Sequence, residues 1–392
     1  MIDSTHARRT CFFIACALPL ACADDSSGDG NGETADTQDA TDEVGTFDGL
    51  FDELASGLNF GLDLAIVPHE PDHGDGDGDA TGDGDGDPLS GDLFVANYGT
   101  SEVLLIPDPS GKTSSTSAQP FFDGTSEGLL GTTGVSIPPD GTLWATFEQG
   151  GEGGKGGVVA LSQDGEVLAR LDAGTHPEAI DHPSGICFGA VDDEAHQAMF
   201  IINYGDGSAW RLDASDGQGT DAVFTRVGSG LATAELGSPG SPGNPISSNQ
   251  TPVGGARGCA FHAGHLYVAD AQNARVVRFD DALEGVDIEG TALEDTPSEL
   301  VTHPTGVAVN ADGALLVISS DNAHAFVALE LPTGNFIDNG IHDLNVNAGN
   351  YGMALASDTI WFLRANNTNG TLRAVTPDQQ TPPNTNSPFP AQ

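Results

Sequence analysis

Two His-Pro pairs that precede short apolar strands are the first candidates for metal chemistry. His182 leads "HPSGICF" and His303 leads "HPTGVAV". Neutral imidazole is a good zinc ligand, so residues at matching places in the chain could share one ion. No third ligand stands beside them, and a His-Pro turn into a strand needs no metal to explain it. We therefore assign no metal site, and keep zinc held by His182 and His303 as the weaker hypothesis.

The arginines are informative because positive charge is scarce in this chain. The sequence has 12 Lys and Arg against 58 Asp and Glu, a formal charge of −46. Arg257 precedes a strand-opening glycine and Arg364 ends a later strand, so either could bind an anion or a carboxylate. Ion pairs with nearby acids are the alternative. The charge argues against nucleic acid and an anionic membrane surface as partners.

These residues stand at fixed places in a repeat of β-strands. Each copy opens with a glycine and an apolar strand, continues through a polar turn to a second strand, and adds a third strand after a few turn residues. Without insertions the copies lie 46 to 51 residues apart. The opening glycines are Gly61, Gly134, Gly185, Gly258, Gly306 and Gly352. Six copies predict an all-β fold, a six-bladed β-propeller with four-stranded blades.

The best copies, "GARGCAFHAGHLYVADAQNARVVRFD" and "HPTGVAVNADGALLVISSDN", resemble the NHL repeat, and the resemblance covers residues from about 55 to 376. It implies an NHL or gluconolactonase-like propeller, a class that includes binding modules, lactonases and lyases. The metal enzymes of this class place their ligands around the residue before the opening glycine. Here those residues are Phe60, Thr133, Ser184, Arg257, Thr305 and Tyr351, and none is Asp, Glu, Asn or His. We expect no cofactor, with calcium or zinc as the alternative.

The ends of the second strands supply further polar candidates for a ligand site. Asn203 and Asp270 stand there, although such side chains also cap their own turns. No catalytic residue is assigned. The candidates for ligand binding at the channel mouth are Arg257, Arg364, Tyr351, His182, His303, Asn203 and Asp270.

Ring closure is expected from Gly45–Leu54, pairing as the outer strand of blade six. The prolines that follow the last repeat cannot donate ladder hydrogen bonds, so that tail is a poor fourth strand. A seven-bladed ring with one blade in residues 229–254 is the alternative. That segment is too rich in Gly, Pro and Ser for four strands.

Three loops are conspicuous. Gly150–Gly157 lacks the Walker pattern of a phosphate loop, and with residues 229–254 it is expected to form the rim of a site on the face of the interblade connections. The acidic insert His69–Asp92 falls on the opposite face. A calcium frame that starts at Asp77 has proline at its twelfth position, Pro88. A solvated loop is therefore expected, with weak calcium binding as the alternative.

The N-terminus predicts export. Arg8 and Arg9 precede "CFFIACALPLA", which has the length of a signal-peptide core, and no apolar window reaches 18 residues. "PLAC" resembles a lipoprotein lipobox with lipidation at Cys22, although Pro19 departs from the pattern and Cys16 ends a rival site. Simple secretion is the alternative. The expected parts are a signal peptide at 1–22, a disordered acidic linker at 23–46, a propeller at 47–378 and a Pro-rich tail at 379–392.

Two cysteines fall within the repeats. Cys187 and Cys259 stand at different offsets from their opening glycines, which predicts opposite orientations and buried free thiols. Taken together, the sequence predicts a monomeric, envelope-anchored binding module for a protein or glycan ligand. The alternative is a metal-dependent lactonase-type hydrolase or lyase.

Overall fold

The described part of the protein consists of strands and short turns. A computed structural model describes residues 52–67, 91–107, 116–138, 140–190, 197–214, 222–233, 255–293, 303–309, 315–319, 326–337, 349–356, 359–366 and 369–375. The chain divides into two compact units, Met1–Val44 and Gly45–Gln392, and all described residues lie in the second. None of them belongs to a helix that is long and apolar enough to cross a membrane.

The described strands form six sheets, and the first three strands of each follow one another along the chain in antiparallel order. In chain order the first is β2 (Gly61–Ile66), β3 (Leu93–Asn97), β4 (Glu102–Ile106) and β6 (Gln119–Asp123), and the second is β7 (Leu129–Ser136), β8 (Leu143–Gly150), β9 (Gly157–Leu161) and β10 (Val167–Asp172). The third is β11 (Pro183–Ala190), β12 (Gln197–Asn203), β13 (Ser208–Ala214) and β14 (Val223–Ser229), and the fourth is β15 (Ala256–His262), β16 (His265–Asp270), β17 (Arg275–Phe279) and β19 (Thr291–Ala292). The fifth is β20 (Pro304–Val309), β21 (Leu315–Ser319), β22 (Phe326–Leu329) and β23 (Phe336–Ile337), and the sixth is β24 (Gly349–Ala356), β25 (Thr359–Asn366), β26 (Asn369–Val375) and β1 (Asp52–Leu58).

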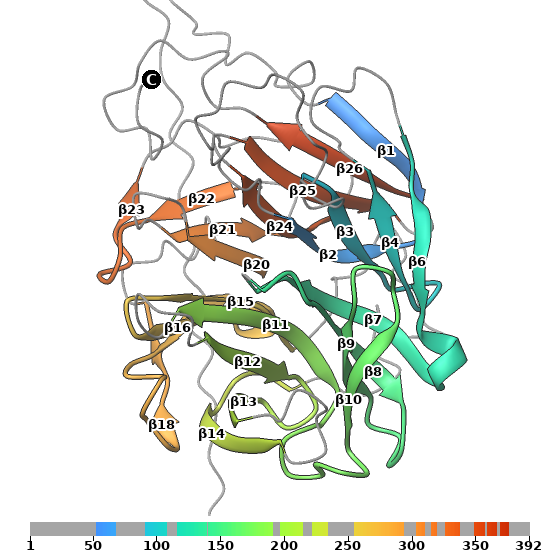
Figure 1. Cartoon of the computed structure of the whole chain (residues 1–392). Coiled ribbons are helices and arrows are strands. Elements are labelled where there is room, and N and C mark those ends of the chain that lie inside the picture. Colours follow the sequence, from blue (N-terminus) through green and yellow to red (C-terminus); the bar gives the residue numbers. More distant parts are fainter. Residues whose placement is uncertain are drawn as a thin grey trace, which may run out of the picture. The chain divides into compact units, whose positions relative to one another are not determined.

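The first strands of the sheets contact one another in a closed circuit. β2 contacts β7, and the contacts continue through β11, β15, β20 and β24 back to β2. Figure 1 shows the sheets of this unit arranged around a common centre. The predicted all-β propeller is therefore confirmed.

Two sheets have a fifth strand that the sequence did not predict. β5 (Thr116–Ser117) pairs parallel with β1, and β18 (Ile288–Glu289) pairs parallel with β14. Each belongs to the connection that leads to the fourth strand of the neighbouring sheet. The connection runs along an outer edge whose hydrogen-bonding groups would otherwise stay unpaired. The expectation of four strands in every blade is wrong for these two sheets.

The chain closes the ring with an N-terminal strand, as predicted. β1 pairs antiparallel with β26, from Asp52 opposite Ala374 to Leu58 opposite Gly370. The strand begins later than the predicted Gly45–Leu54, and residues 45–51 lie outside the described residues. Ala55 and Leu58 are fully buried against the first and sixth sheets, so the closing strand also contributes to the core.

The glycines of the repeat are explained by close packing of the inner strands. A Cβ atom on Gly185 would lie 2.3 Å from the backbone oxygen of Arg257, and one on Gly258 would lie 2.9 Å from the Cα of Gly306. Neither distance leaves room for a methyl group. The repeated glycine therefore lets neighbouring blades approach at the centre.

The prediction of free thiols is wrong, because Cys187 and Cys259 form a disulfide with their Cα atoms 5.7 Å apart. The cysteines lie on β11 and β15, in one apolar cluster between the third and fourth sheets. Neighbouring blades meet through opposite faces of the repeat. Side chains of opposite orientation therefore face each other across the interface, so the different offsets favour a disulfide.

Candidate functional site

The strand register places Asp63 where other inner strands have their opening glycine. Each inner strand has an irregularity in pairing, and the residue just after it is Asp63 in β2, Gly134 in β7, Gly185 in β11 and Gly306 in β20. In β15 and β24 that residue is Cys259 and Met353, and the glycine lies within the irregularity. The sequence alignment on Gly61 was therefore two residues out of register. The residue just before this position is Leu62 and not Phe60. The irregularity depends on pairing between strands, which the sequence alone did not reveal.

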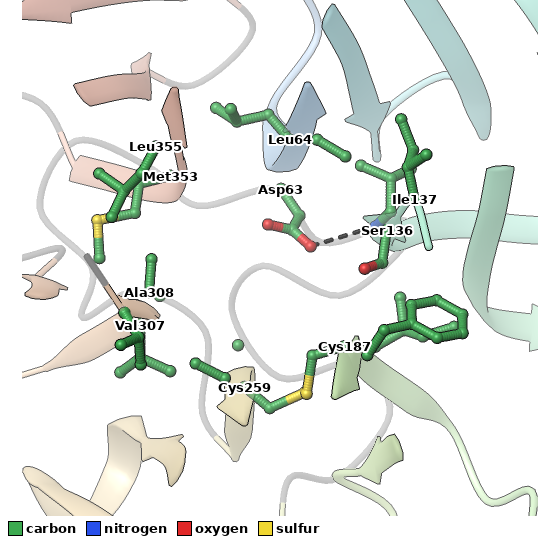
Figure 2. A pocket seen from close by; sticks show the side chains of 18 of the residues that line it. Asp63, Leu64, Ser136, Ile137, Cys187, Cys259, Val307, Ala308, Met353 and Leu355 are labelled. Atoms are coloured by element: carbon green, nitrogen blue, oxygen red, sulfur yellow. Dashed lines mark hydrogen bonds between the residues drawn. A yellow bond between two sulfur atoms is a disulfide. The ribbon is translucent and has the colours of Figure 1, made fainter. Parts of the chain in front are cut away.

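A cavity of about 490 Å³ lies between the six inner strands. Figure 2 shows its wall, which includes the Cys187–Cys259 disulfide and apolar side chains such as Val307 and Met353. The cavity extends to the ends of these strands, where its lining residues are Ile66, Ile137, Phe188, Phe261, Val309 and Leu355. It therefore opens toward the hairpins between first and second strands, opposite the face expected to carry the rim.

Asp63 points into this cavity (Figure 2). The backbone N–H of Val135 donates a hydrogen bond to its Oδ2 at 3.1 Å. Burial raises the pKa of the Asp63 carboxyl from 3.8 to about 7, and hydrogen bonds from the backbone of Val135 and Leu64 partly oppose the shift. The ring encloses the side chain, yet the cavity leaves it partly exposed to solvent. The group can thus change its protonation state near neutral pH.

On its other side Asp63 borders a void of about 10 Å³, room for about one water molecule. This void is lined by five of the six residues that the sequence placed before the glycines, namely Thr133, Ser184, Arg257, Thr305 and Tyr351. The structure thus brings together Arg257 and Tyr351, two of the predicted candidates. Both are buried, at 7% and 3% exposure.

A buried carboxyl that the sequence did not single out lies near Arg257. Glu148, in β8, is 1% exposed, and neither of its carboxyl oxygens has a hydrogen-bond partner of good geometry among the described residues. Burial raises its pKa, and the charge of Arg257 and the nearby hydroxyls of Tyr204 and Tyr98 oppose the shift. The guanidinium of Arg257 lies over the Tyr204 ring, 5.4 Å from its centroid.

Glu148, Arg257, Tyr204 and Tyr98 form a polar cluster. The cluster explains why the wide cavity lies at the opposite end of the inner strands. Its side chains come from several blades and fill the space on the side of the interblade connections. A glutamate inside the apolar strand "LWATFEQG" was the available signal for it.

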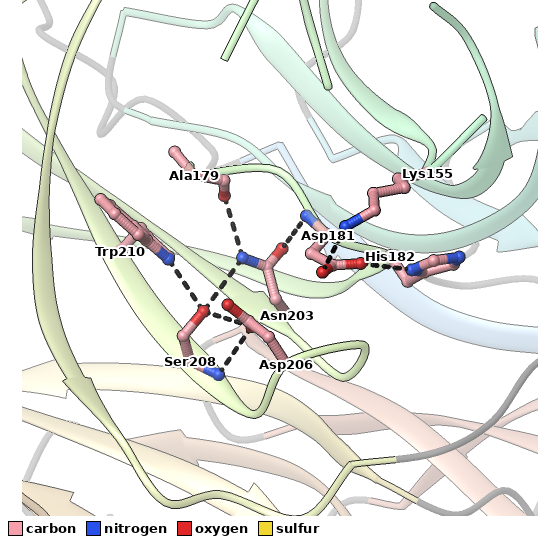
Figure 3. Close-up of polar contacts among 8 residues, drawn as sticks. All are labelled: Lys155, Ala179, Asp181, His182, Asn203, Asp206, Ser208 and Trp210. Atoms are coloured by element: carbon pink, nitrogen blue, oxygen red, sulfur yellow. Dashed lines mark hydrogen bonds and ion pairs between the residues drawn. The ribbon is translucent and has the colours of Figure 1, made fainter. Parts of the chain in front are cut away.

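His182 belongs to a chain of polar side chains that includes Lys155 and Asp181 (Figure 3). Its Nδ1 lies 2.6 Å from Oδ1 of Asp181, and Lys155 Nζ lies 2.8 Å from the other oxygen of that carboxylate. The His182 backbone has φ 58°, a region that non-glycine residues seldom adopt. Its Nε2 is buried without a hydrogen-bond partner among the described residues.

His303 stands two sheets away from His182, directly before β20, with β15 between the two inner strands. Within the described ranges, no group of three or more His, Cys, Asp or Glu side chains is arranged to hold a metal ion. The two-histidine zinc hypothesis gains no third ligand from these residues.

Asn203 and Asp270 anchor loops. Asn203 donates to the Ala179 carbonyl at 2.9 Å and accepts from the Asp181 backbone N–H at 3.2 Å (Figure 3). Asp270 is fully buried, and its two oxygens accept from the Ala232 backbone N–H at 3.0 Å and from Arg275 Nε at 2.8 Å. Their hydrogen bonds account for both residues without a ligand.

Arg364 is half-buried in β25. It pairs in register with Asn350 and Thr371, and it lines neither the cavity nor the void. The remaining candidate, Cys22, lies outside the described residues.

No family model matches this sequence, and no curated protein matches it. Among solved structures, a luciferin-regenerating enzyme has 12% sequence identity and a TM-score of 0.49, covering 83% of this chain and 95% of that one. A putative gluconolactonase has 14% identity and a TM-score of 0.47, with 83% and 92% covered. A gluconolactonase from Xanthomonas campestris has 12% identity and a TM-score of 0.43, with 83% and 88% covered. The fold assignment above depends on the sheet topology alone.

Proposed function

We propose that this chain is a non-catalytic binding module, a six-bladed propeller whose central cavity takes a small molecule. The observation that carries the proposal is the cavity of about 490 Å³, whose described lining residues are mostly of apolar type, with one acidic side chain, Asp63, directed into it. Small-molecule sites have volumes of this order and carry a few convergent polar groups.

The blade count of six is supported by the circuit of inner strands. Six inner strands contact one another in sequence, and β24 returns to β2. β11 also contacts β15 directly, so the chain between them contributes no inner strand at that place. Residues 234–254, which the seven-bladed alternative requires, lie outside the described residues.

Anchoring at the cell envelope is part of the proposal. The signal-like N-terminus and Cys22 motivate it, and the Cys187–Cys259 disulfide supports export, because disulfides form and persist in oxidising compartments. A protein or glycan partner would use the rim loops, on the face away from the cavity opening. Partition of the expressed protein between detergent and water, compared with Cys22→Ala, tests the anchor. If both proteins partition equally into water, lipidation at Cys22 is wrong and secretion without an anchor is the remaining alternative.

Binding in the cavity is tested with the neutral fluorophore N-phenyl-1-naphthylamine. Saturable 1:1 binding with increased fluorescence is expected for the wild type and should be lost in Ala308→Trp, which places an indole in the cavity. Val286→Trp is the matched control, because Val286 is 64% exposed and does not line the cavity. Absence of saturable binding to the wild type would overturn the proposal.

The competing function is a metal-dependent lactonase. A stoichiometric divalent ion in the purified protein, together with lactone hydrolysis that is lost on chelation, would replace the binding module.

A further inference from the structure

We infer that the ligand of the cavity is an organic cation, an ammonium group joined to an apolar body, and that Asp63 binds the ammonium group. This inference rests on the proposed binding function of the cavity. It goes further by stating which chemistry the cavity selects.

The first support is that β2 departs from the repeat where Asp63 stands. The equivalent Gly185 is packed against the Arg257 backbone and could not accept a side chain. The preceding inner strand β24 keeps its own glycine against β2, since a Cβ on Gly352 would lie 2.5 Å from the Asp63 Cα. The close approach of the blades is thus retained while a carboxylate enters the cavity.

The second support is the electrostatic position of Asp63. Apart from the disulfide-bonded cysteines, it is the one ionisable side chain among the described residues that line the cavity. Ser136 lines the cavity beside it, Arg257 and Tyr351 line the small void on its far side, and no salt bridge joins Asp63 to a described residue. One carboxylate oxygen accepts the Val135 N–H. A ligand cation would supply the counter-charge that this buried site lacks.

The third support is the negative charge of the sequence that connects Val67 to Gly91. The chain leaves the first sheet at Val67 and returns at Gly91, whose N–H donates to the Val67 carbonyl at 3.1 Å. Ile66, next to Val67, lines the cavity. The 23 residues from 68 to 90 contain eight acids and neither Lys nor Arg. Negative charge in the protein raises the concentration of cations around it and repels anions.

The raised pKa of Asp63 gives the binding a defined pH dependence. The empty site holds a proton below about pH 7. An ammonium ion prefers the carboxylate, so binding at pH 6 should displace the proton. Affinity is therefore expected to be roughly tenfold lower at pH 6 than at pH 8.

The test compares 4-phenylbutylamine with its neutral counterpart 4-phenylbutan-1-ol by titration calorimetry at pH 8. We expect the amine to bind the wild type at least tenfold more tightly than the alcohol. Asp63→Asn should abolish this preference, while Asp164→Asn, at an exposed turn residue, should retain it. At pH 6, titrations in buffers of different ionisation enthalpy should show about one proton released by the wild type and none by Asp63→Asn.

The outcomes separate this inference from the proposed function. The fluorophore can bind in the cavity while the amine and the alcohol bind equally, or while neither of them binds. In both cases the inference of an organic cation is wrong and the proposed binding function is retained. If the fluorophore and both phenylbutyl compounds fail to bind, the proposed function falls as well. Urea unfolding of Asp63→Asn shows that the variant is folded, so that a lost preference is not a lost fold.

Discussion

Two carboxyl groups near the propeller centre, Asp63 and Glu148, illustrate what single residues contribute to this molecule. Burial raises the pKa of both, and Glu148 has no hydrogen-bond partner of good geometry among the described residues. A buried charge costs free energy unless a partner compensates for it. Groups with these properties are therefore better explained by a ligand or by proton binding than by stability.

Asp63 should make the fold less stable as pH rises. Its folded-state pKa lies above the unfolded value, so the folded state binds more protons between about pH 4 and pH 7, and stability falls across that window. Asp63→Asn removes this loss and should stabilise the protein by about 2–4 kcal/mol at pH 8. Urea unfolding at pH 4.5 and pH 8 measures the effect. The same pH dependence in both proteins would contradict the assignment.

Gly185 should tolerate no side chain, because a Cβ there would lie 2.3 Å from a backbone oxygen of the next blade. We expect Gly185→Ala to destabilise the protein by about 3 kcal/mol. Gly264→Ala is the control: its φ of 85° is unfavourable, but nothing lies within 4 Å of the added Cβ. It should cost about 1 kcal/mol. Equal losses in thermal unfolding would argue against the close approach of β11 and β15.

At the scale of elements, the ring is held by one covalent and one non-covalent closure. The Cys187–Cys259 disulfide joins the third and fourth sheets across 72 residues of chain, and β1 joins the N-terminal part of the unit to β26. Both closures connect strands that are distant in the sequence. They should therefore contribute strongly to the free energy of unfolding.

Replacement of both cysteines, Cys187→Ala with Cys259→Ala, should lower the free energy of unfolding by about 2–5 kcal/mol. The measurement is urea unfolding with and without a reductant. The reductant should destabilise the wild type and leave the double variant unchanged. An effect of the reductant on the variant would point to another disulfide.

Removal of β1 should open the ring. A chain that starts at residue 59 loses the pairing with β26 and the buried Ala55 and Leu58, whereas a chain that starts at residue 52 retains both. The shorter chain should be less stable by about 3–5 kcal/mol, and the amides of β26 should exchange faster. Equal protection of β26 in the two chains would show that β1 is not the closing strand.

At the scale of the whole molecule, the formal charge of −46 sets the response to salt. Repulsion among so many like charges opposes the compact state and is screened by ions. Raising NaCl from 10 to 200 mM should therefore stabilise the fold by about 1 kcal/mol or more. Thermal unfolding is measured in NaCl and, for comparison, in sucrose. Sucrose stabilises proteins without screening charge, so it separates charge screening from general stabilisation by a solute. An unfolding temperature that is independent of NaCl would contradict this expectation.

The sequence by itself determined the strands, the repeat, the all-β propeller and the closing strand near the N-terminus. Strand alternation, turn residues and like charges are properties of consecutive residues, so they can be read without knowledge of pairing. The repeat also predicted that Arg257 and Tyr351 would meet at the centre, since equivalent positions of a ring converge there.

Only the tertiary structure decided the register, the disulfide and the place of the cavity. The pairing irregularity in β2 puts Asp63, and not Gly61, at the position of the repeat glycine, because the extra residue of a bulge shifts the side chains that follow it. The two cysteines meet because neighbouring blades present opposite faces, and the polar cluster around Glu148 occupies one end of the channel. Each result depends on contacts between strands that are far apart in the chain, which no local pattern encodes.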